Sequence, residues 1–302
     1  MTTIPGTRTE LVQTRGLRFE VTMAGGSGPG DKLALLLHGF PECAYSWREQ
    51  IPLLAKLGYR VWAPNLRGYG KSDRPLAVSD YTIDKLEQDV ADLIEASGAK
   101  SVVLVGHDWG GLIAWSFAMY NPGKLERLVI LNVPHPARLQ RGLRTWKQLR
   151  KSWYMMFFQI RGLPERVLSL RDFMVVGRAF REMAVHKDRF TDDVLEVFKR
   201  NAAEPGALSA MLNYYRARPH AFGLAKKRGM PKIETKTLMI WGEQDSALGR
   251  ELTYGTEHHV SDLTLRYIAD ASHWVQQDRP DAVNAMLSAF LSEQPVPEAT
   301  AL

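Results

Sequence analysis

The stretch VGHDWGG, residues 105–111, stands where a short β-rich run ends and an apolar helical pattern begins. Gly106 and Gly110 are the small residues that a sharp turn from strand to helix requires, because neighbouring backbone packs closely against such a turn. Turns of this form can present a nucleophile at their centre, and the central residue here is Asp108. The dipole of the following helix would keep its carboxylate ionised. Aspartate is also a common helix N-cap, so this stretch alone leaves both roles open.

Short β-rich runs and helical patterns alternate on both sides of this turn. The expected strands cover residues 17–23, 32–37, 60–63, 101–105 and 127–131, and then residues 236–241 and 263–268. The expected helices cover residues 45–57 (interrupted at Pro52), 83–97 and 112–120, a stretch beginning at Ala247, and residues 280–291. This alternation is typical of βαβ units, so we predict the α/β class, with a mainly parallel sheet flanked by helices.

The alternation lapses between residues 134 and 230, where the pattern is helical or irregular. This segment has 20 Lys and Arg against 8 Asp and Glu, about +12, in a chain whose net charge is +6. The basic residues are scattered at helical spacing without a recognition motif, which favours a solvated helix face over a nucleic-acid site. We therefore expect a core domain of residues 1–133 and 231–302, with residues 134–230 as a helical cap inserted after the sixth strand.

The composition of the chain indicates the class of protein and its expected location in the cell. With 45% hydrophobic and 24% charged residues, the chain is an ordinary globular protein. The longest purely apolar run near the N-terminus, residues 33–37, is far shorter than the roughly 20 residues that span a bilayer, so we expect no membrane insertion. A single cysteine, Cys43, excludes an internal disulfide and favours a reducing compartment, the cytoplasm. Whether the protein is a monomer or a homodimer stays open.

Two further polar residues follow expected strands. Asp245 lies in WGEQDSA and His273 lies in ASHWVQQDRP. Each alone has a simpler explanation, a helix cap for Asp245 and a structural histidine for His273. Ligands bind at the carboxyl ends of parallel strands, however, and the chain order Asp108, Asp245, His273 is that of a nucleophile–acid–histidine triad. Taken together, the three residues predict a catalytic site.

The stretch HGFPE, residues 38–42, ends another expected strand. Its backbone could aim the N–H of Phe40 at an oxyanion, beside the N–H of Trp109. Phe40, Pro41 and Trp109 are also candidates for contact with the substrate. The simpler alternative is a turn that Gly39 and Pro41 enforce.

These motifs together resemble those of the α/β-hydrolase superfamily and, within it, the soluble epoxide hydrolases. The resemblance rests on HGFPECAYSWREQIP, LRGYGKSD, GHDWGG and SHWVQQDRP, and extends from about residue 16 to residue 291. It implies the α/β-hydrolase fold with a helical cap. It also implies two cap tyrosines that hydrogen-bond the epoxide oxygen. The motif WYMMFFQ places the first at Tyr154; in LNYYR, Tyr215 fits better than Tyr214, for which ordinary core packing is a plausible alternative.

A carboxylate in the place of the nucleophile has a chemical consequence. Serine attacking a saturated carbon would leave an ether, whereas a carboxylate leaves an ester. Water can open that ester at the carbonyl carbon of the aspartate and regenerate the enzyme. Asp108 therefore predicts displacement at a saturated carbon followed by ester hydrolysis, which excludes most esterase, lipase and peptidase activities.

The resemblance implies that an apolar epoxide and water give a vicinal diol through a covalent ester on Asp108. His273, held in one tautomer by Asp245, would take the proton of the attacking water. Tyr154 and Tyr215 would bond the departing oxygen, one of them donating the proton. No cofactor and no metal ion is expected, and a detoxification role would suit the reaction.

Two alternatives stay open at this stage. A haloalkane dehalogenase uses the same aspartate and the following Trp109, but it often has an asparagine where this chain has Phe40. Trp146 or Trp153 would then have to be the second donor to the halide. A non-catalytic ligand-binding protein of the same fold is the other alternative, although no member of the triad is missing.

Overall fold

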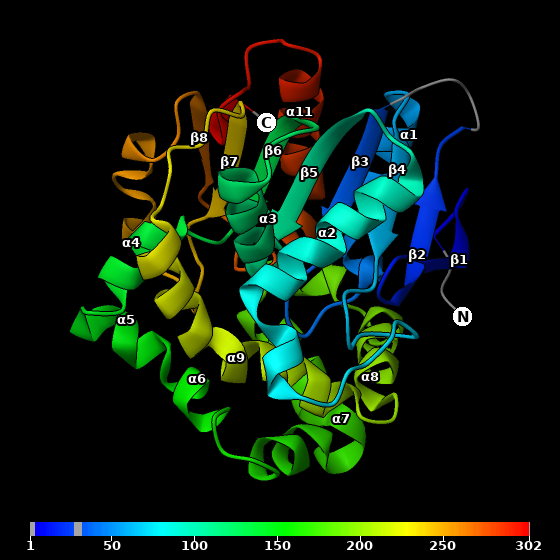
Figure 1. Cartoon of the computed structure of the whole chain (residues 1–302), viewed down its shortest axis with the longest axis vertical. Helices are drawn as coiled ribbons and strands as arrows, with labels where there is room; N and C mark the ends of the chain where they lie inside the picture. Colours follow the sequence, from blue (N-terminus) through cyan, green and yellow to red (C-terminus); the bar gives the residue numbers. More distant parts are fainter. Residues whose placement is uncertain (1–3, 27–31, 302) are drawn as a thin grey trace.

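The computed structural model describes residues 4–26 and 32–301, and its centre is an eight-stranded sheet (Figure 1). The strands are β1 (Arg8–Gln13), β2 (Arg18–Ala24), β3 (Lys32–Leu37), β4 (Arg60–Pro64), β5 (Ser101–His107), β6 (Leu125–Leu131), β7 (Thr237–Gly242) and β8 (Leu263–Ile268). Their order in the sheet is β1-β2-β4-β3-β5-β6-β7-β8. The pairs β1–β2 and β2–β4 are antiparallel, and the pairs from β4 to β8 are parallel.

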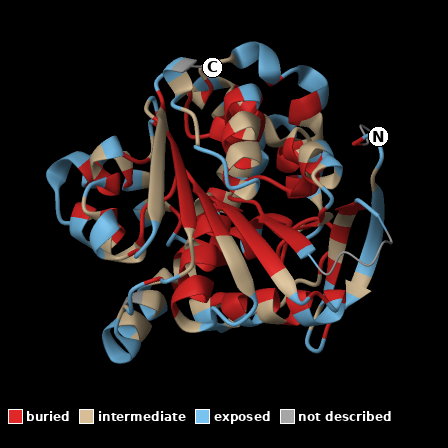
Figure 2. Ribbon diagram, turned by 90° about the horizontal axis from the view of Figure 1, so that it is seen from above, coloured by how far each residue is buried: buried red, intermediate tan, exposed pale blue. Residues whose placement is uncertain are grey.

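Helices cover both faces of this sheet (Figure 2). Those of the core are α1 (Gln50–Lys56), α2 (Ile83–Ser97), α3 (Asp108–Tyr120), α10 (Val275–Asp278) and α11 (Pro280–Leu291). Side chains of a strand alternate between faces, and β3 shows the result. Leu33, Leu35 and Leu37 pack in one apolar cluster with α2 and α3, whereas Ala34 and Leu36 belong to a second cluster with α1 and α11. A strand buried on both faces explains the continuous apolar run of β3.

Six α-helices lie between β6 and β7. They are α4 (Pro136–Gly142), α5 (Trp146–Lys151), α6 (Trp153–Phe157), α7 (Leu163–Met183), α8 (Asp192–Ala203) and α9 (Ala207–Arg228). α7 is interrupted at Leu170–Phe173, where the backbone leaves the helical conformation. These helices occupy the lower part of Figure 1, with α5 and α6 along its outer margin. Among the residues described here, no helix is both long and apolar enough to cross a membrane.

Short 3₁₀ turns complete the described chain, and one group of them corrects the sequence-based expectation. They are η1 (Ala44–Trp47), η2 (Val78–Tyr81), η3 (Lys187–Arg189), η4 (Arg250–Thr253), η5 (Thr256–His258) and η6 (Ala299–Ala301). The helix expected from Ala247 is wrong, because η4 and η5 stand in its place. There the carboxylate of Asp245 accepts the backbone N–H groups of Ala247 and Leu248, and Gly255 adopts a positive φ of 83°. Both features favour turns over a continuous helix.

The α/β class and the mainly parallel sheet are confirmed. The helices expected at residues 83–97 and 280–291 match α2 and α11 residue for residue. The strand β1 was missing from the expected elements. Its residues RTELVQ are almost all exposed at the sheet edge, so the apolar alternation of a half-buried strand is absent. With β1 included, the helices α4 to α9 follow the sixth strand in the chain, β6.

Candidate active site

The turn between β5 and α3 places Asp108 at the carboxyl end of the sheet. Asp108 has a positive φ of 48°, a region that residues other than glycine rarely adopt. The turn is tight enough to require glycine nearby: a Cβ on Gly110 would collide with the carbonyl oxygen of Leu37, and one on Gly106 would lie 2.5 Å from the carbonyl oxygen of Gly110. The strained turn therefore holds the Asp108 carboxylate away from its own helix and toward the neighbouring loops.

Asp108, Asp245 and His273 come together from the ends of β5, β7 and β8. The His273 Nδ1 lies 2.8 Å from Oδ2 of Asp245 and hydrogen-bonds it. On its other side, His273 Nε2 lies 3.6 Å from Oδ2 of Asp108, beyond ordinary hydrogen-bond length. The imidazole is thus anchored by Asp245, with its free nitrogen facing Asp108.

The charges of this group reinforce one another. Burial would lower the pKa of His273, but the charges of Asp245 and Asp108 and the hydrogen bond to Asp245 raise it well above its ordinary value. Burial would raise the pKa of Asp108, but the nearby charge of His273 holds it below its ordinary value. Asp245 behaves in the same way, since the charge of His273 outweighs its burial and lowers its pKa. Both carboxylates are ionised at neutral pH.

Asn132, which the sequence did not single out, orients the acid of this group. It follows β6 with a positive φ of 41°. Its Nδ2 donates to Asp245 Oδ2 at 2.9 Å, and its Oδ1 accepts the N–H of Gly242 at 2.8 Å. The other oxygen of Asp245 accepts the N–H groups of Ala247 and Leu248 at 2.7 and 2.8 Å. Asp245 is therefore fixed on both oxygens, which in turn fixes the ring of His273.

The HGFPE loop reaches the same carboxylate from β3. The N–H of Phe40 donates to Oδ1 of Asp108 at 2.9 Å. The N–H of Trp109 lies in the first turn of α3, where backbone N–H groups have no partner within the helix. Two backbone donors are thus available next to the carboxylate carbon of Asp108, at the position expected for an oxyanion hole.

Glu42, the last residue of that loop, is a completely buried carboxylate with four donors around it. Its Oε2 accepts the N–H of Gly39 and Nδ1 of His107, each at 2.7 Å. Its Oε1 accepts the side-chain amides of Gln276 and Gln277 at 3.0 and 2.9 Å. Burial would raise the pKa of Glu42, but the charge and hydrogen bond of His107 lower it. Glu42 therefore joins the loop after β3, the turn after β5 and helix α10.

His107 and His38 differ in the partners of their rings. His107 Nδ1 meets the Glu42 carboxylate, and its Nε2 lies 2.8 Å from the carbonyl oxygen of His273. Both of these partners are acceptors. His38 Nε2, in contrast, accepts the N–H of Leu66 at 3.1 Å, so that ring is neutral. Burial lowers the pKa of His38 to about 4, in agreement with this assignment.

A cavity of about 290 Å³ lies over Asp108 and His273. Tyr154 from α6 and Tyr215 from α9 both line it, with their ring centroids 6.0 Å apart. Apolar side chains form most of the remaining wall, among them Phe40, Trp153, Phe158, Leu168, Val175, Val176 and Met183. Burial and the charge of Asp108 raise the pKa of both phenols, so each keeps its proton at neutral pH.

The structure separates the two adjacent tyrosines of LNYYR. The hydroxyl of Tyr214 donates to the carbonyl oxygen of Arg67 at 2.9 Å and is buried away from the cavity. Tyr215 lines the cavity, and its ring lies against Trp109 with centroids 5.1 Å apart. Of the two, only Tyr215 faces Asp108.

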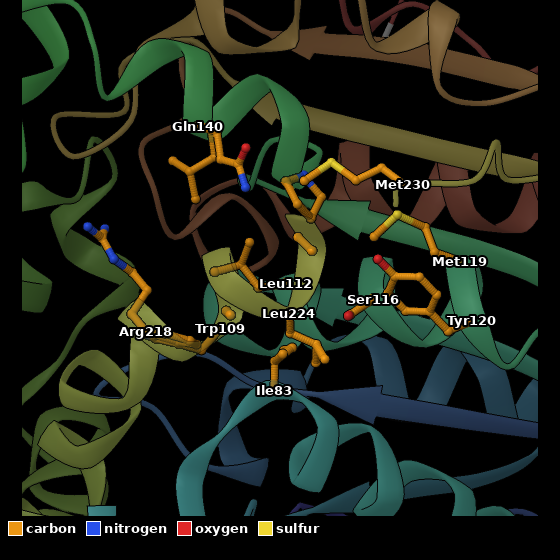
Figure 3. A pocket seen from close by; sticks show the side chains of 14 residues that line it. Ile83, Trp109, Leu112, Ser116, Met119, Tyr120, Gln140, Arg218, Leu224 and Met230 are labelled. Atoms are coloured by element: carbon orange, nitrogen blue, oxygen red, sulfur yellow. The ribbon is translucent and has the colours of Figure 1, made fainter. Parts of the chain in front are cut away.

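A second cavity, of about 70 Å³, is lined on one side by Trp109 (Figure 3). Leu112 and Met119 of α3 and Met230 surround it, and Arg218 lies at its edge. Its described lining holds no carboxylate and no imidazole, so the ionisable chemistry belongs to the cavity over Asp108. Within residues 4–26 and 32–301, no cluster of His, Cys, Asp and Glu side chains is placed to hold a metal ion.

Comparison with known proteins agrees with this fold and arrangement. A family profile described as "alpha/beta hydrolase fold" matches residues 34–280. Human "Epoxide hydrolase 4" is 40% identical over 290 residues, which cover 94% of this chain and 78% of that protein. The "AB hydrolase superfamily protein YfhM" of Bacillus subtilis is 38% identical over 292 residues, covering 96% of this chain and 99% of that one. The crystal structure of the Bacillus megaterium epoxide hydrolase with an inhibitor has a TM-score of 0.85 at 30% identity, over 94% of this chain and 100% of that one.

By its profile and its sheet, the protein has the α/β-hydrolase fold. Within that class, the chain belongs to the epoxide hydrolases. The resemblance noted in its motifs is thereby confirmed. The sequence missed Asn132 and the partners of Glu42, because no local motif marks a residue that acts on a side chain from a distant part of the chain.

Proposed function

We propose that this protein hydrolyses an apolar epoxide to a vicinal diol through an ester formed on Asp108. One observation carries the proposal: Asp108, His273, Tyr154 and Tyr215 line a single cavity, and Asp245 holds the far nitrogen of His273. Relatives and structural neighbours named epoxide hydrolases support the reaction class. Residues 134–230 would act as the cap, since the two tyrosines come from that segment and the triad comes from residues 1–133 and 231–302.

The first step is attack on an epoxide carbon. Oδ1 of Asp108 is held by the N–H of Phe40, which leaves Oδ2 to form the new carbon–oxygen bond. The strained epoxide carbon–oxygen bond breaks, and its oxygen takes a proton from Tyr154 or Tyr215. The raised pKa of both phenols keeps that proton available at neutral pH. The product of this step is a hydroxy-ester on Asp108 and a phenolate in the cavity.

The second step is hydrolysis of the ester. Alkylation removes the negative charge of Asp108, one of the charges that raise the pKa of His273. As this pKa falls, His273 gives its proton to the phenolate; the neutral ring then takes a proton from water, which attacks the carbonyl carbon of Asp108. The oxyanion forms on Oδ1, beside the N–H groups of Phe40 and Trp109. Collapse leaves a carboxylic acid on Asp108 and an alkoxide; His273 protonates the alkoxide to give the diol, and the Asp108 acid then returns a proton to His273.

The cavity supports an apolar substrate. Its wall is aromatic and aliphatic apart from the catalytic groups, Lys151 and Ser246. The ammonium of Lys151 is hydrogen-bonded to the carbonyl oxygen of Asp245 at 2.9 Å, so it is already engaged. An aryl or alkyl epoxide suits such a wall better than a charged one.

The same geometry disfavours halide release. A halide needs two side-chain N–H donors, and Trp109 would have to be joined by Trp146 or Trp153. Trp146 is 76% exposed and does not line the cavity; Trp153 lines it, but is itself 66% exposed. The indole of Trp109 lies against the ring of Tyr215, with centroids 5.1 Å apart. The intact triad, in turn, gives no support to a ligand-binding protein without catalysis.

A cytoplasmic location and a role in detoxification belong to this proposal. The single cysteine, Cys43, is a buried free thiol, which suits a reducing compartment. An apolar epoxide is an alkylating agent, and its conversion to a diol removes that reactivity.

The test uses His273→Gln and intact-protein mass spectrometry after incubation with styrene oxide. We expect the mass to rise by one substrate molecule, because the ester forms but lacks its general base. The matched control is Asp108→Asn, which should keep the unmodified mass. An unmodified mass in His273→Gln, with diol still produced, would refute the covalent step.

A further inference from the structure

Helices α5 and α6 and the start of α7 carry an exposed line of large apolar side chains. Its members, here called the apolar stripe, are Trp146, Leu149, Trp153, Met156, Ile160 and Leu163. Trp146 and Leu149 of α5, and Trp153 and Met156 of α6, are each three residues apart, the spacing that places side chains along one side of a helix. Ile160 lies between α6 and α7. Trp146, Trp153 and Met156 are 76%, 66% and 73% exposed. Single exposed apolar residues are ordinary, but a continuous run with two tryptophans marks an interaction surface.

Helix α5 buries an uncharged polar side chain and exposes two large apolar ones. Gln148 is buried and donates to the carbonyl oxygen of Ala247 at 2.9 Å, while its side-chain oxygen accepts the N–H of Gly249. Ser152, also buried, accepts a hydrogen bond from Gln148 at 3.0 Å. Gln148 thus faces the protein, whereas Trp146 and Leu149 are exposed together with the charged Lys147 and Arg150. An ordinary surface helix buries its apolar side chains instead.

The surroundings of the stripe are strongly basic. Residues 134–164 contain seven Lys and Arg and no Asp or Glu. The members that are exposed beside the stripe, here called the basic flank, are Arg141, Arg144, Lys147, Arg150 and Arg161. Of these, Lys147 forms an ion pair with Glu251 of the core at 3.0 Å. The sequence predicted a solvated face for these charges; the structure adds that they border an apolar surface.

We propose that the apolar stripe and the basic flank bind the surface of bilayers that contain anionic lipids. Exposed tryptophans with lysines and arginines around them are the composition of helices that lie in the plane of a membrane interface. α5 and α6 would lie in that plane without crossing the bilayer. A second copy of the chain is a poorer occupant, because a symmetric contact would bring the basic flanks of both copies together.

The apolar stripe lies next to the cavity over Asp108, which suggests a function for membrane binding. Trp153 belongs to the stripe and also lines the cavity over Asp108, next to Tyr154. Docking would therefore bring the cavity to the lipid, where an apolar epoxide concentrates. This use rests on the proposed function, whereas the binding itself does not.

Vesicle sedimentation tests the binding without any substrate. We expect the wild-type protein to sediment with vesicles of phosphatidylcholine and phosphatidylglycerol, and far less with phosphatidylcholine alone. Replacing Arg144 and Arg150 by glutamine should lower the partition coefficient by about fivefold for each charge at low salt. The double variant Trp146→Ser, Met156→Ser should lower it at least about tenfold, because it removes apolar area that would enter the interface.

Leu11→Ser is the matched control, since Leu11 is an exposed apolar residue on β1, at the opposite edge of the sheet from β8. It should bind like the wild type, and circular dichroism should show that all variants are folded. The proposal would be overturned if the wild type failed to bind anionic vesicles or bound neutral vesicles equally well. It would also be overturned if Leu11→Ser lost as much vesicle binding as the stripe variant. Stripe-dependent dimers in analytical ultracentrifugation would assign the surface to a second copy instead. Vesicle binding by a protein that hydrolyses no epoxide would leave this inference standing and refute only the proposed function.

Discussion

Replacing Glu42 by glutamine tests whether the buried carboxylate organises the site. Glutamine has nearly the same shape, but it offers one acceptor oxygen where glutamate has two. In the better of its two orientations, the new amide donates to a neutral His107 and keeps its oxygen toward Gln276 and Gln277. The N–H of Gly39 then loses its acceptor.

The cost follows from these contacts. A buried donor without a partner costs about 1–3 kcal/mol, and the charge-assisted bond to His107 contributes about 1.5–3 kcal/mol. Added together, the two contributions agree with the roughly 3–5 kcal/mol measured when one partner of a buried ion pair is removed. For a protein of this size, a loss of about 3 kcal/mol lowers the thermal midpoint by roughly 6–12 °C.

Thermal unfolding followed by circular dichroism measures this effect. Glu10→Gln is the control: Glu10 is paired with Arg8 at 2.7 Å, but both side chains are more than half exposed. An exposed pair contributes less than about 1 kcal/mol, so this midpoint should hardly move. A Glu42→Gln midpoint within about 1 °C of the wild type would refute the organising role of the Glu42 carboxylate, since such a shift corresponds to less than about 1 kcal/mol.

Three further outcomes are expected. Asp245→Asn should slow ester hydrolysis by about 10²–10⁴-fold, because His273 loses the partner that fixes its tautomer. Stopped-flow fluorescence should then show a burst of ester formation followed by slow turnover. Unchanged turnover would contradict this role of Asp245. The double variant Tyr154→Phe, Tyr215→Phe should lose far more epoxide hydrolysis activity than either single variant. If its loss were only the sum of the two single losses, the two tyrosines would have no shared role. The pKa of His273 is raised in the folded protein, so its stabilising effect is present below the ordinary histidine pKa of about 6.5 and is lost as the pH rises through the folded value. The difference in unfolding free energy between the wild type and His273→Gln should therefore shrink above neutral pH, and a constant difference in urea titrations would count against the assignment.

Local patterns explain how much of the molecule the sequence could predict. The glycines around Asp108 and the alternation of strand and helix are recorded in adjacent residues, so the turn after β5 and the sheet class follow from them. The placement of Asp245 and His273 beside Asp108 follows from a rule of parallel sheets, that loops at the carboxyl ends of strands meet. Such rules hold whatever the detailed packing.

Other features depend on contacts between distant segments. Glu42 meets His107 across 65 positions and Gln277 across 235, so the reason for its burial cannot be seen in HGFPE itself. The outward position of Trp146 is a similar case. Its helical spacing suggests packing against the core, and only the structure shows that Gln148 is buried in its place.

The arrangement around His273 also explains how one residue can suit both steps of the proposed reaction. Before attack, the negative charges of Asp108 and Asp245 raise its pKa, and its positive charge in return lowers the pKa of Asp108. A charged His273 thus keeps the nucleophile ionised, but it cannot accept a proton. Ester formation neutralises Asp108 and leaves Asp245 as the only remaining carboxylate in contact with the ring, so the pKa of His273 falls when a base is needed. The first step therefore prepares the second, and this order requires a carboxylate at the nucleophile position, since a serine would carry no charge to lose.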